Sequence, residues 1–313
     1  MLNKYWRSFP WYIQLLQFIV LIVVMASFFL FALSPVIMHW TGVTAEDIRN
    51  LDVNSTDKTV NTTLLIQFLS SSGIFLLPAL LFAYFTHPRP AGFLGLRKPG
   101  RSVHWLLPAL IMLAAAPLLT GLAGWLEQMV DLGGSVKQMQ EENNRMFSAL
   151  LAISNPVQLL ITFTVLAILP GFSEELFFRG IIMRFAAKRS YSIAFPLVVS
   201  ALMFALLHSN IYGLPSIFTA GLLLGGFYYL TGSIWPSIIA HTLFNGTQVL
   251  LSYLGRDNAL GDIVKQDNVP LSWVMIGTPI AIAAFFLLWK TRTPLKPHWA
   301  ADYDPKEIMD GSE

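Results

Sequence analysis

The stretch "NPVQLLITFTVLAILPGFSEELFFRGIIM", residues 155–183, is long and apolar enough to cross a membrane, yet it ends with two adjacent carboxylates and an arginine. A charged side chain at the centre of a lone membrane helix costs about 2.5–3.5 kcal/mol. Apolar residues continue after Glu174, Glu175 and Arg179, and the basic cluster that should mark the membrane surface begins only at Arg184. We therefore predict that these acids lie below the membrane surface and have a function there.

The composition of the whole chain indicates an integral membrane protein. The 313 residues are 55% hydrophobic and 12% charged, and the mean hydropathy is +0.59. A soluble domain has roughly a quarter charged residues. The partner indicated is the lipid bilayer, with no nucleic acid. Cysteine is absent, which excludes disulfides, thiol nucleophiles and thiolate metal sites.

We predict an all-α, polytopic membrane protein that forms a single membrane domain over residues 1–313. About 20 apolar residues cross the bilayer as a helix, and about eight segments reach that length. They are residues 12–38, 64–85, 104–126, 155–183, 192–210, 213–231, 234–254 and 271–290. Residues 135–150 read as a short interfacial helix, and residues 291–313 as a polar cytoplasmic tail.

The basic residues predict the orientation, because cytoplasmic segments carry an excess of Lys and Arg. With the N-terminus inside, only six of the 20 Lys and Arg residues lie outside: Arg49, Lys58, Lys137, Arg145, Arg256 and Lys265. This bias favours an even number of spans with both termini in the cytoplasm. If the source is bacterial, the membrane is the plasma membrane.

Helical geometry separates the roles of the two glutamates. Glu175 and Arg179 are four residues apart and can form an ion pair, whereas Glu174 points about 100° away. Pro170 should bend the helix just before them, because it lacks an N–H and its ring clashes with the carbonyl of Leu166. We predict that Glu175 is structural and that Glu174 is free to react.

Two further polar sites occur in later spans. His208 ends "FALLH" (204–208), and in an antiparallel hairpin with the preceding span it reaches the depth of Glu174. His241 and Asn245 bound "HTLFN" (241–245) and share one helical face. Such residues can also be helix–helix hydrogen bonders. The depth match of His208 to Glu174 is what favours a catalytic site, while the match of His241 is looser.

The three motifs "EELFFRG" (174–180), "FALLH" and "HTLFN" resemble E-E-x-x-x-R, F-x-x-x-H and H-x-x-x-N. These belong to the CAAX-protease and bacteriocin-processing (CPBP, or Abi) family of intramembrane proteases, which includes the endopeptidase that trims prenylated CAAX proteins. The resemblance covers residues 155–250, the expected catalytic core. It implies an intramembrane endopeptidase with a catalytic cavity open to the cytoplasm, and a membrane-associated peptide or protein as substrate.

Transferred residue by residue, the resemblance implies that Glu174 activates water with help from His208. His241 and Asn245 would stabilise the oxyanion, and Glu175 and Arg179 would support the site. Members of the family have been described both as metalloproteases and as glutamate-dependent proteases without a metal. We favour the metal-free route and no cofactor. The alternative is a divalent metal such as zinc, held by Glu174, His208 and His241.

Two other functional classes stay open from the residues alone. A proton-coupled transporter would use the same acid and histidines as a relay, but no acid or base leads outward from them. A non-catalytic membrane scaffold would keep the polar residues as a packing network. The substrate also stays open between a CAAX-type C-terminus and a leader peptide.

Overall fold

The computed structural model describes residues 6, 9–188, 190, 192–255, 269–296 and 299–300, and all regular structure in these residues is helical. The predicted all-α class is confirmed. The first five residues and most of the predicted tail, 297–298 and 301–313, lie outside the described residues.

All eight predicted spans are helical. The first span comprises α2 (Trp11–Ser27), η1 (Phe28–Leu33) and α3 (Ser34–Thr41), and the second comprises α5 (Asp57–Ser71), η2 (Ser72–Leu76) and α6 (Leu77–Thr86). The third comprises η3 (Ser102–Trp105) and α8 (Leu107–Met129). The fourth comprises α10 (Pro156–Phe163), η4 (Thr164–Ile168), α11 (Leu169–Glu175), η5 (Leu176–Ile182) and α12 (Met183–Ala187). The last four are α13 (Ala194–Leu206), α14 (Leu214–Thr231), α15 (Trp235–Gly255) and α17 (Leu271–Thr291). Short connecting helices are α4 (Ala45–Arg49), α7 (Pro90–Phe93) and α9 (Gly134–Leu150), the last at the predicted interfacial segment.

Six of these helices, within the described residues, are long and apolar enough to cross a membrane, so the number eight is not confirmed. The two exceptions are α13 and α15. Helix α13 has 13 residues, about 20 Å at 1.5 Å per residue. Helix α15 has 21 residues, but His241, Asn245 and other polar side chains lower its hydropathy. Both exceptions carry or adjoin the predicted site histidines.

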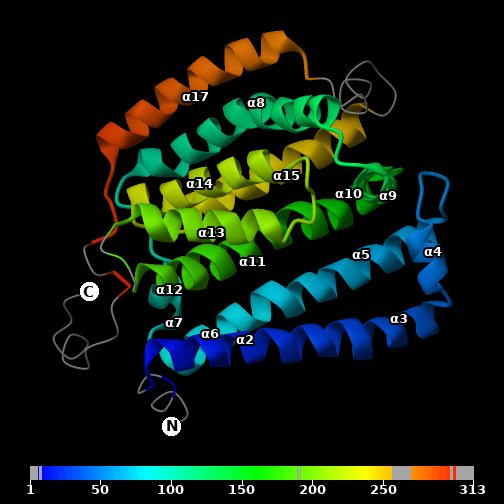
Figure 1. The fold of residues 1–313 in the computed structure, drawn as a ribbon, viewed down its shortest axis with the longest axis horizontal. Helices are drawn as coiled ribbons and strands as arrows, with labels where there is room; N and C mark the ends of the chain where they lie inside the picture. Colours follow the sequence, from blue (N-terminus) through cyan, green and yellow to red (C-terminus); the bar gives the residue numbers. More distant parts are fainter. Residues whose placement is uncertain are drawn as a thin grey trace.

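The helices lie roughly side by side in the bundle (Figure 1). Helix α17 packs on α8, and α8 packs on α14 and α15. Helices α2 and α6 lie along the opposite side and reach the centre through contacts with η2 and η5. The start of α2 and the end of α17 lie at the same end, as an even number of crossings requires; we call it the near end, and the end with α4 and α9 the far end.

Three of the long spans contain a π-helical segment directly before a proline. Segments η1, η2 and η4 are each followed by an α-helix with proline in its first turn: Pro35, Pro78 and Pro170. Proline lacks the N–H for a regular i→i−4 bond and clashes with the facing carbonyl. A wider π turn relieves this conflict. At η4, just before Pro170, the π-helical segment is the irregular backbone that the proline predicted. The bend of the helix axis at this point stays a prediction.

At the near end, the residues that follow α17 form hydrogen bonds with the rest of the bundle. The backbone N–H groups of Thr293 and Leu295 donate to the carbonyls of Leu230 and Tyr229 at 2.8 and 2.9 Å, and so cap the C-terminal end of α14. Arg184 donates to the carbonyls of Trp299 and Phe93 at 2.8 and 2.9 Å. The described part of the predicted tail is thus attached to the bundle.

Candidate active site

Glu174 and Glu175 occupy the last turn of α11, between the π-helical segments η4 and η5. Single π turns inside α-helices occur frequently at functional sites. Here they bracket a short α-helical segment that is buried on most of its surface, including Gly171, Ser173 and Glu175. The two carboxylates therefore lie on a helix held on both sides by irregular backbone.

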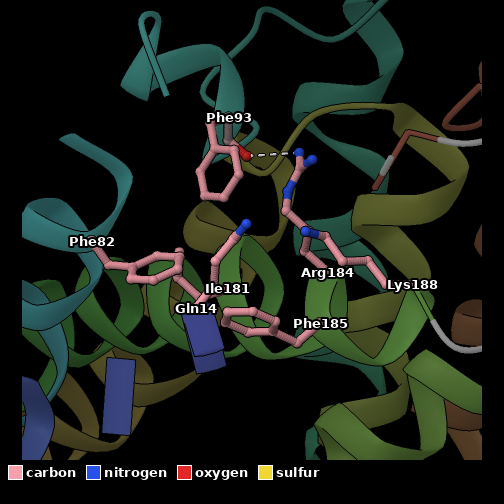
Figure 2. Close-up of a pocket in the computed structure, with 7 residues that line it drawn as sticks. All are labelled: Gln14, Phe82, Phe93, Ile181, Arg184, Phe185 and Lys188. Atoms are coloured by element: carbon pink, nitrogen blue, oxygen red, sulfur yellow. Dashed lines mark hydrogen bonds between the residues drawn. The ribbon is translucent and has the colours of Figure 1, made fainter. Parts of the chain in front are cut away.

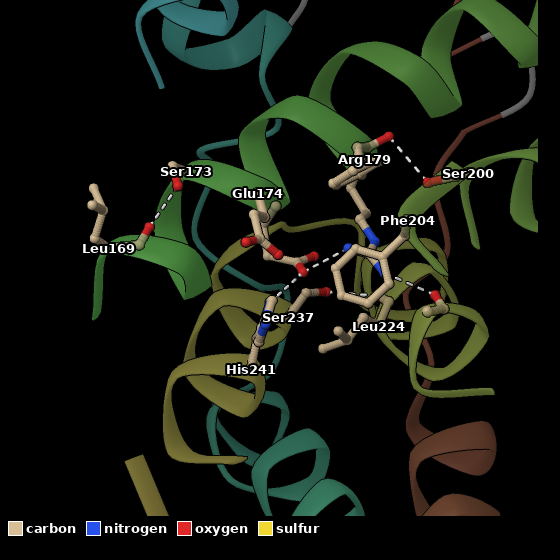
Figure 3. Close-up of polar contacts among 12 residues, drawn as sticks. Leu169, Ser173, Glu174, Arg179, Ser200, Phe204, Leu224, Ser237 and His241 are labelled. Carbon is tan, nitrogen blue, oxygen red and sulfur yellow. Dashed lines mark hydrogen bonds and ion pairs between the residues drawn. The ribbon is translucent and has the colours of Figure 1, made fainter. Parts of the chain in front are cut away.

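Glu175 is the centre of a buried ion-pair network that joins α11, η5 and α15 (Figure 3). Its Oε1 atom accepts from Nη1 of Arg179 at 2.7 Å and faces Nδ1 of His241 at 2.9 Å. The side chains of Glu175 and Arg179 are fully buried, and that of His241 is 5% exposed. Because a carboxylate only accepts, Nδ1 of His241 carries a proton that it donates to Glu175.

Arg179 extends this network to two further helices. Its Nη2 atom donates to the carbonyl of Gly221 on α14 at 2.9 Å, and its guanidinium lies 4.7 Å from the ring centroid of Phe204 on α13. Removing one partner of a buried ion pair is strongly destabilising, because the other charge stays buried without compensation. These contacts give Glu175 and Arg179 a direct part in holding four helices together.

Glu174 faces the other histidine. Its Oε2 atom lies 3.9 Å from Nε2 of His208, and it is buried without a hydrogen-bond partner. This distance exceeds a direct hydrogen bond. The side chains of Glu174 and His208 are 13% and 33% exposed. Exposure therefore increases from Glu175 to Glu174 to His208.

His208 lies just beyond the end of α13, which corrects its expected place inside a helix running to residue 210. Its Nδ1 atom contacts the carbonyl of Phe204 at 2.7 Å. A carbonyl only accepts, so Nδ1 carries a proton and Nε2 is the nitrogen that faces Glu174. The next residue, Ser209, has φ 51°, the one positive value among the described non-glycine residues.

Asn245 lies one turn after His241 on α15 and is partly buried. It makes no hydrogen bond within the described part of the chain, so its amide is not tied to the Glu175 network. The structure thus brings together Glu174 with His208, and Glu175 with Arg179 and His241. It places Asn245 beside the second group, on the same helical face as His241.

The structure does not gather the three suggested zinc ligands into one group. Across the described ranges, no group of three or more His, Asp or Glu residues is placed to hold a metal, and this includes Glu174, His208 and His241. The Nδ1 atoms of the two histidines contact the carbonyl of Phe204 and the carboxylate of Glu175, so only their Nε2 atoms are available as ligands. The metal-free route stays a prediction.

Two serines in the same region were missed by the sequence reasoning. The hydroxyls of Ser200 and Ser237 donate to the carbonyls of Phe178 and Leu224 at 3.1 and 2.8 Å and join neighbouring helices (Figure 3). Phe204 was missed as a contact residue too, although it opens the "FALLH" motif; its ring lies 4.5 Å from that of His208 and 5.7 Å from that of His241. Isolated serines carry no pattern that would have predicted these bonds.

Two hollows elsewhere in the molecule contain no site residue in their walls. One, about 10 Å³, lies at the near end between Phe82, Phe93 and Arg184 (Figure 2). The other is an apolar groove of about 360 Å³ between α8 and α17. The first is too small for a substrate, since ligand pockets usually measure about 300–1,000 Å³. The predicted catalytic cavity around Glu174 stays a prediction.

The apolar helical bundle and its buried acid–histidine network define an integral membrane protein with a buried polar site. Residues 156–247 match the family model described as type II CAAX prenyl endopeptidase Rce1-like. This segment is therefore similar to Rce1-like proteases, and the resemblance inferred from the three motifs is confirmed over it. The similarity suggests a protease and a peptide substrate in a bilayer. No curated protein and no solved structure matched the chain.

Proposed function

We propose that the protein is an intramembrane endopeptidase that hydrolyses a peptide bond in a membrane-associated substrate, with Glu174 and His208 as the groups that activate water. The observation that carries this proposal is the pairing of Glu174 Oε2 with His208 Nε2 at 3.9 Å. Both atoms accept hydrogen bonds when Glu174 is ionised and His208 is neutral. One water can donate a proton to each of them.

Such a water is oriented for attack. Its two O–H bonds point to Glu174 and His208, so its lone pairs face away from both and toward an incoming carbonyl carbon. As the C–O bond forms, Glu174 takes one proton from the water and the carbonyl oxygen becomes an oxyanion. When the C–N bond breaks, that proton passes to the departing amine. The second proton of the water is then on the new carboxyl group and is lost to His208 and from there to solvent, so the products are a carboxylate and an amine.

His241 and Asn245 are the proposed donors to the oxyanion. Because Nδ1 of His241 already donates to Glu175, its Nε2 can donate only when the ring is an imidazolium. The Glu175 carboxylate, which also balances Arg179, would stabilise that form. The amide of Asn245 supplies a second donor from the same face of α15.

The decisive variant is Glu174→Gln, which keeps the shape of the side chain and removes the base. We expect it to insert and fold normally and to lose cleavage of a membrane-associated peptide, with a CAAX-type C-terminus and a leader peptide tested in parallel. Glu141→Gln, at an exposed position on α9, is the matched control and should cleave normally. Full proteolysis by purified Glu174→Gln would end the proposal.

The metal-free route is tested by treating the active enzyme with a strong chelator and measuring its metal content. We expect activity to persist. Inhibition that zinc reverses would favour the metal alternative. If neither peptide is cut by the wild type, a comparison of membrane proteomes from cells with wild-type protein and with Glu174→Gln identifies any uncut substrate. The absence of any difference there would favour a scaffold.

A further inference from the structure

Helices α11 and α15 come into backbone contact at Gly171. A methyl group added to Gly171 would clash with the hydroxyl oxygen of Thr242 and would lie 2.9 Å from its backbone nitrogen and 3.0 Å from its Cα. A side-chain hydroxyl can rotate away, but backbone atoms cannot. Gly171 therefore permits a helix spacing that any larger residue would widen by several tenths of an ångström.

This contact lies next to the buried network. Glu175 is four residues after Gly171 on the same face of α11, and His241 directly precedes Thr242. One turn further along α15, a methyl group on Gly246 would lie 2.6 Å from the ring of Phe163 at the end of α10. Helix α15 thus packs closely on α10 at Gly246 and on α11 at Gly171, and the 2.9 Å contact between Glu175 and His241 comes one turn after Gly171 on α11.

We infer that Gly171 is a positioning residue for the proposed reaction: its missing side chain sets the helix spacing at which Glu175 holds His241. This inference rests on the proposed function only for its effect on cleavage. Widening the seam would stretch the bond between Glu175 Oε1 and His241 Nδ1 beyond the range of a strong hydrogen bond. His241 would then lose its fixed orientation and its compensating charge.

The test compares alanine substitutions at three glycines in the full-length protein, labelled with ¹⁵N at histidine. Gly171→Ala should change the ring-nitrogen resonances of His241, which are assigned by their loss in His241→Gln. It should also lower kcat by about 100-fold with little change in KM, the scale expected for an ångström-level misplacement. Gly226→Ala is the matched control, because a methyl group there meets nothing within 4 Å.

A second substitution separates a clash with the hydroxyl from a limit on the helix spacing. Thr242→Gly removes the hydroxyl that a residue-171 methyl group would strike but keeps the backbone nitrogen and Cα at 2.9 and 3.0 Å, so the double variant with Gly171→Ala should stay impaired in the His241 signal and in kcat. Gly246→Ala, which meets a movable ring edge, should give a smaller change than Gly171→Ala. A double variant that regains the wild-type signal and kcat would overturn the inference, since it would show that Gly171 makes room for the hydroxyl and does not set the helix spacing.

The remaining outcomes are also decisive. Wild-type His241 resonances in Gly171→Ala would overturn the inference, whatever happens to cleavage. If Gly171→Ala does not fold while Gly246→Ala folds with unchanged His241 resonances, the glycine serves folding and not positioning, which overturns it too. If the wild type cleaves no peptide, the proposed function fails, while the resonances of His241 still decide the inference.

Discussion

At the scale of single residues, the two adjacent glutamates have different surroundings although they differ by one position. Glu175 is fully buried between Arg179 and His241, whereas Glu174 is partly exposed and faces His208 across 3.9 Å. The helical rotation of about 100° per residue is enough to create this difference. We therefore predict that Glu175 serves the structure and that Glu174 is left for chemistry.

We expect Glu175→Gln to destabilise the fold strongly. The substitution leaves the Arg179 guanidinium buried without its counter-charge, which typically costs about 3–5 kcal/mol. Thermal unfolding in detergent should show a clear fall in Tm, compared with the wild type and with Glu141→Gln. A Glu175→Gln variant that melts with the wild type and is as inactive as Glu174→Gln would show that the two roles are assigned wrongly.

The pairing of Glu175 with His241 could not be predicted from the sequence, although the pair of Glu175 with Arg179 could. Residues four apart on a helix meet whatever the fold. Contact between residues 175 and 241 depends on how closely α11 and α15 approach, and that distance is set by Gly171. A lone glycine in an apolar helix does not indicate which partner it meets.

At the scale of elements, the end of α13 fixes His208. The helix stops at Leu206, the chain turns through Ser209 with φ 51°, and the freed carbonyl of Phe204 holds the imidazole. The sequence predicted the helix and its depth, because both follow from apolar length. It did not predict the stop, since neither proline nor glycine occurs between Ala205 and Asn210.

The stability of Ser209 variants should therefore depend on how well the new residue adopts the left-handed backbone conformation. Glycine and asparagine tolerate this conformation, while an ordinary residue pays roughly 1–2 kcal/mol and a β-branched one more. We expect Ser209→Gly and Ser209→Asn to melt at or above the wild-type Tm and to cleave normally. Ser209→Val should melt lower and lose kcat as His208 moves. Equal stability across the three variants would contradict this account.

At the scale of the whole molecule, the ends of the predicted spans agree with the observed helices to within a few residues in most cases. Apolar length is a strong signal for this class of protein. The largest difference is at α5, which begins at Asp57 and not at residue 64; Thr56 caps it with its hydroxyl. The sequence contains this capping residue. The start of the helix was nevertheless placed too late, because its first turn is polar and the prediction relied on hydropathy.

The orientation in the membrane is the whole-molecule prediction that labelling can test. The chain has no cysteine, so a single introduced thiol is labelled without background. Glu46→Cys lies exposed on α4 at the far end, and Lys98→Cys lies exposed at the near end. In intact cells an impermeant maleimide should label only Glu46→Cys, and permeabilisation should expose Lys98→Cys. The reverse pattern would place both termini outside the cytoplasm.

The two π-helical segments on either side of α11 have a consequence for how the site keeps its identity. A π turn adds one residue to a helical circuit, and a shift of such a turn along the chain screws the intervening segment round by about one residue, or 100°. A shift in step at η4 and η5 would bring Glu174 to the place of Glu175. It would also bring Pro170 to the place of Gly171, where a side chain meets the backbone nitrogen of Thr242 at 2.9 Å. The close contact at Gly171 therefore opposes such a shift and keeps Glu175 in contact with Arg179 and His241.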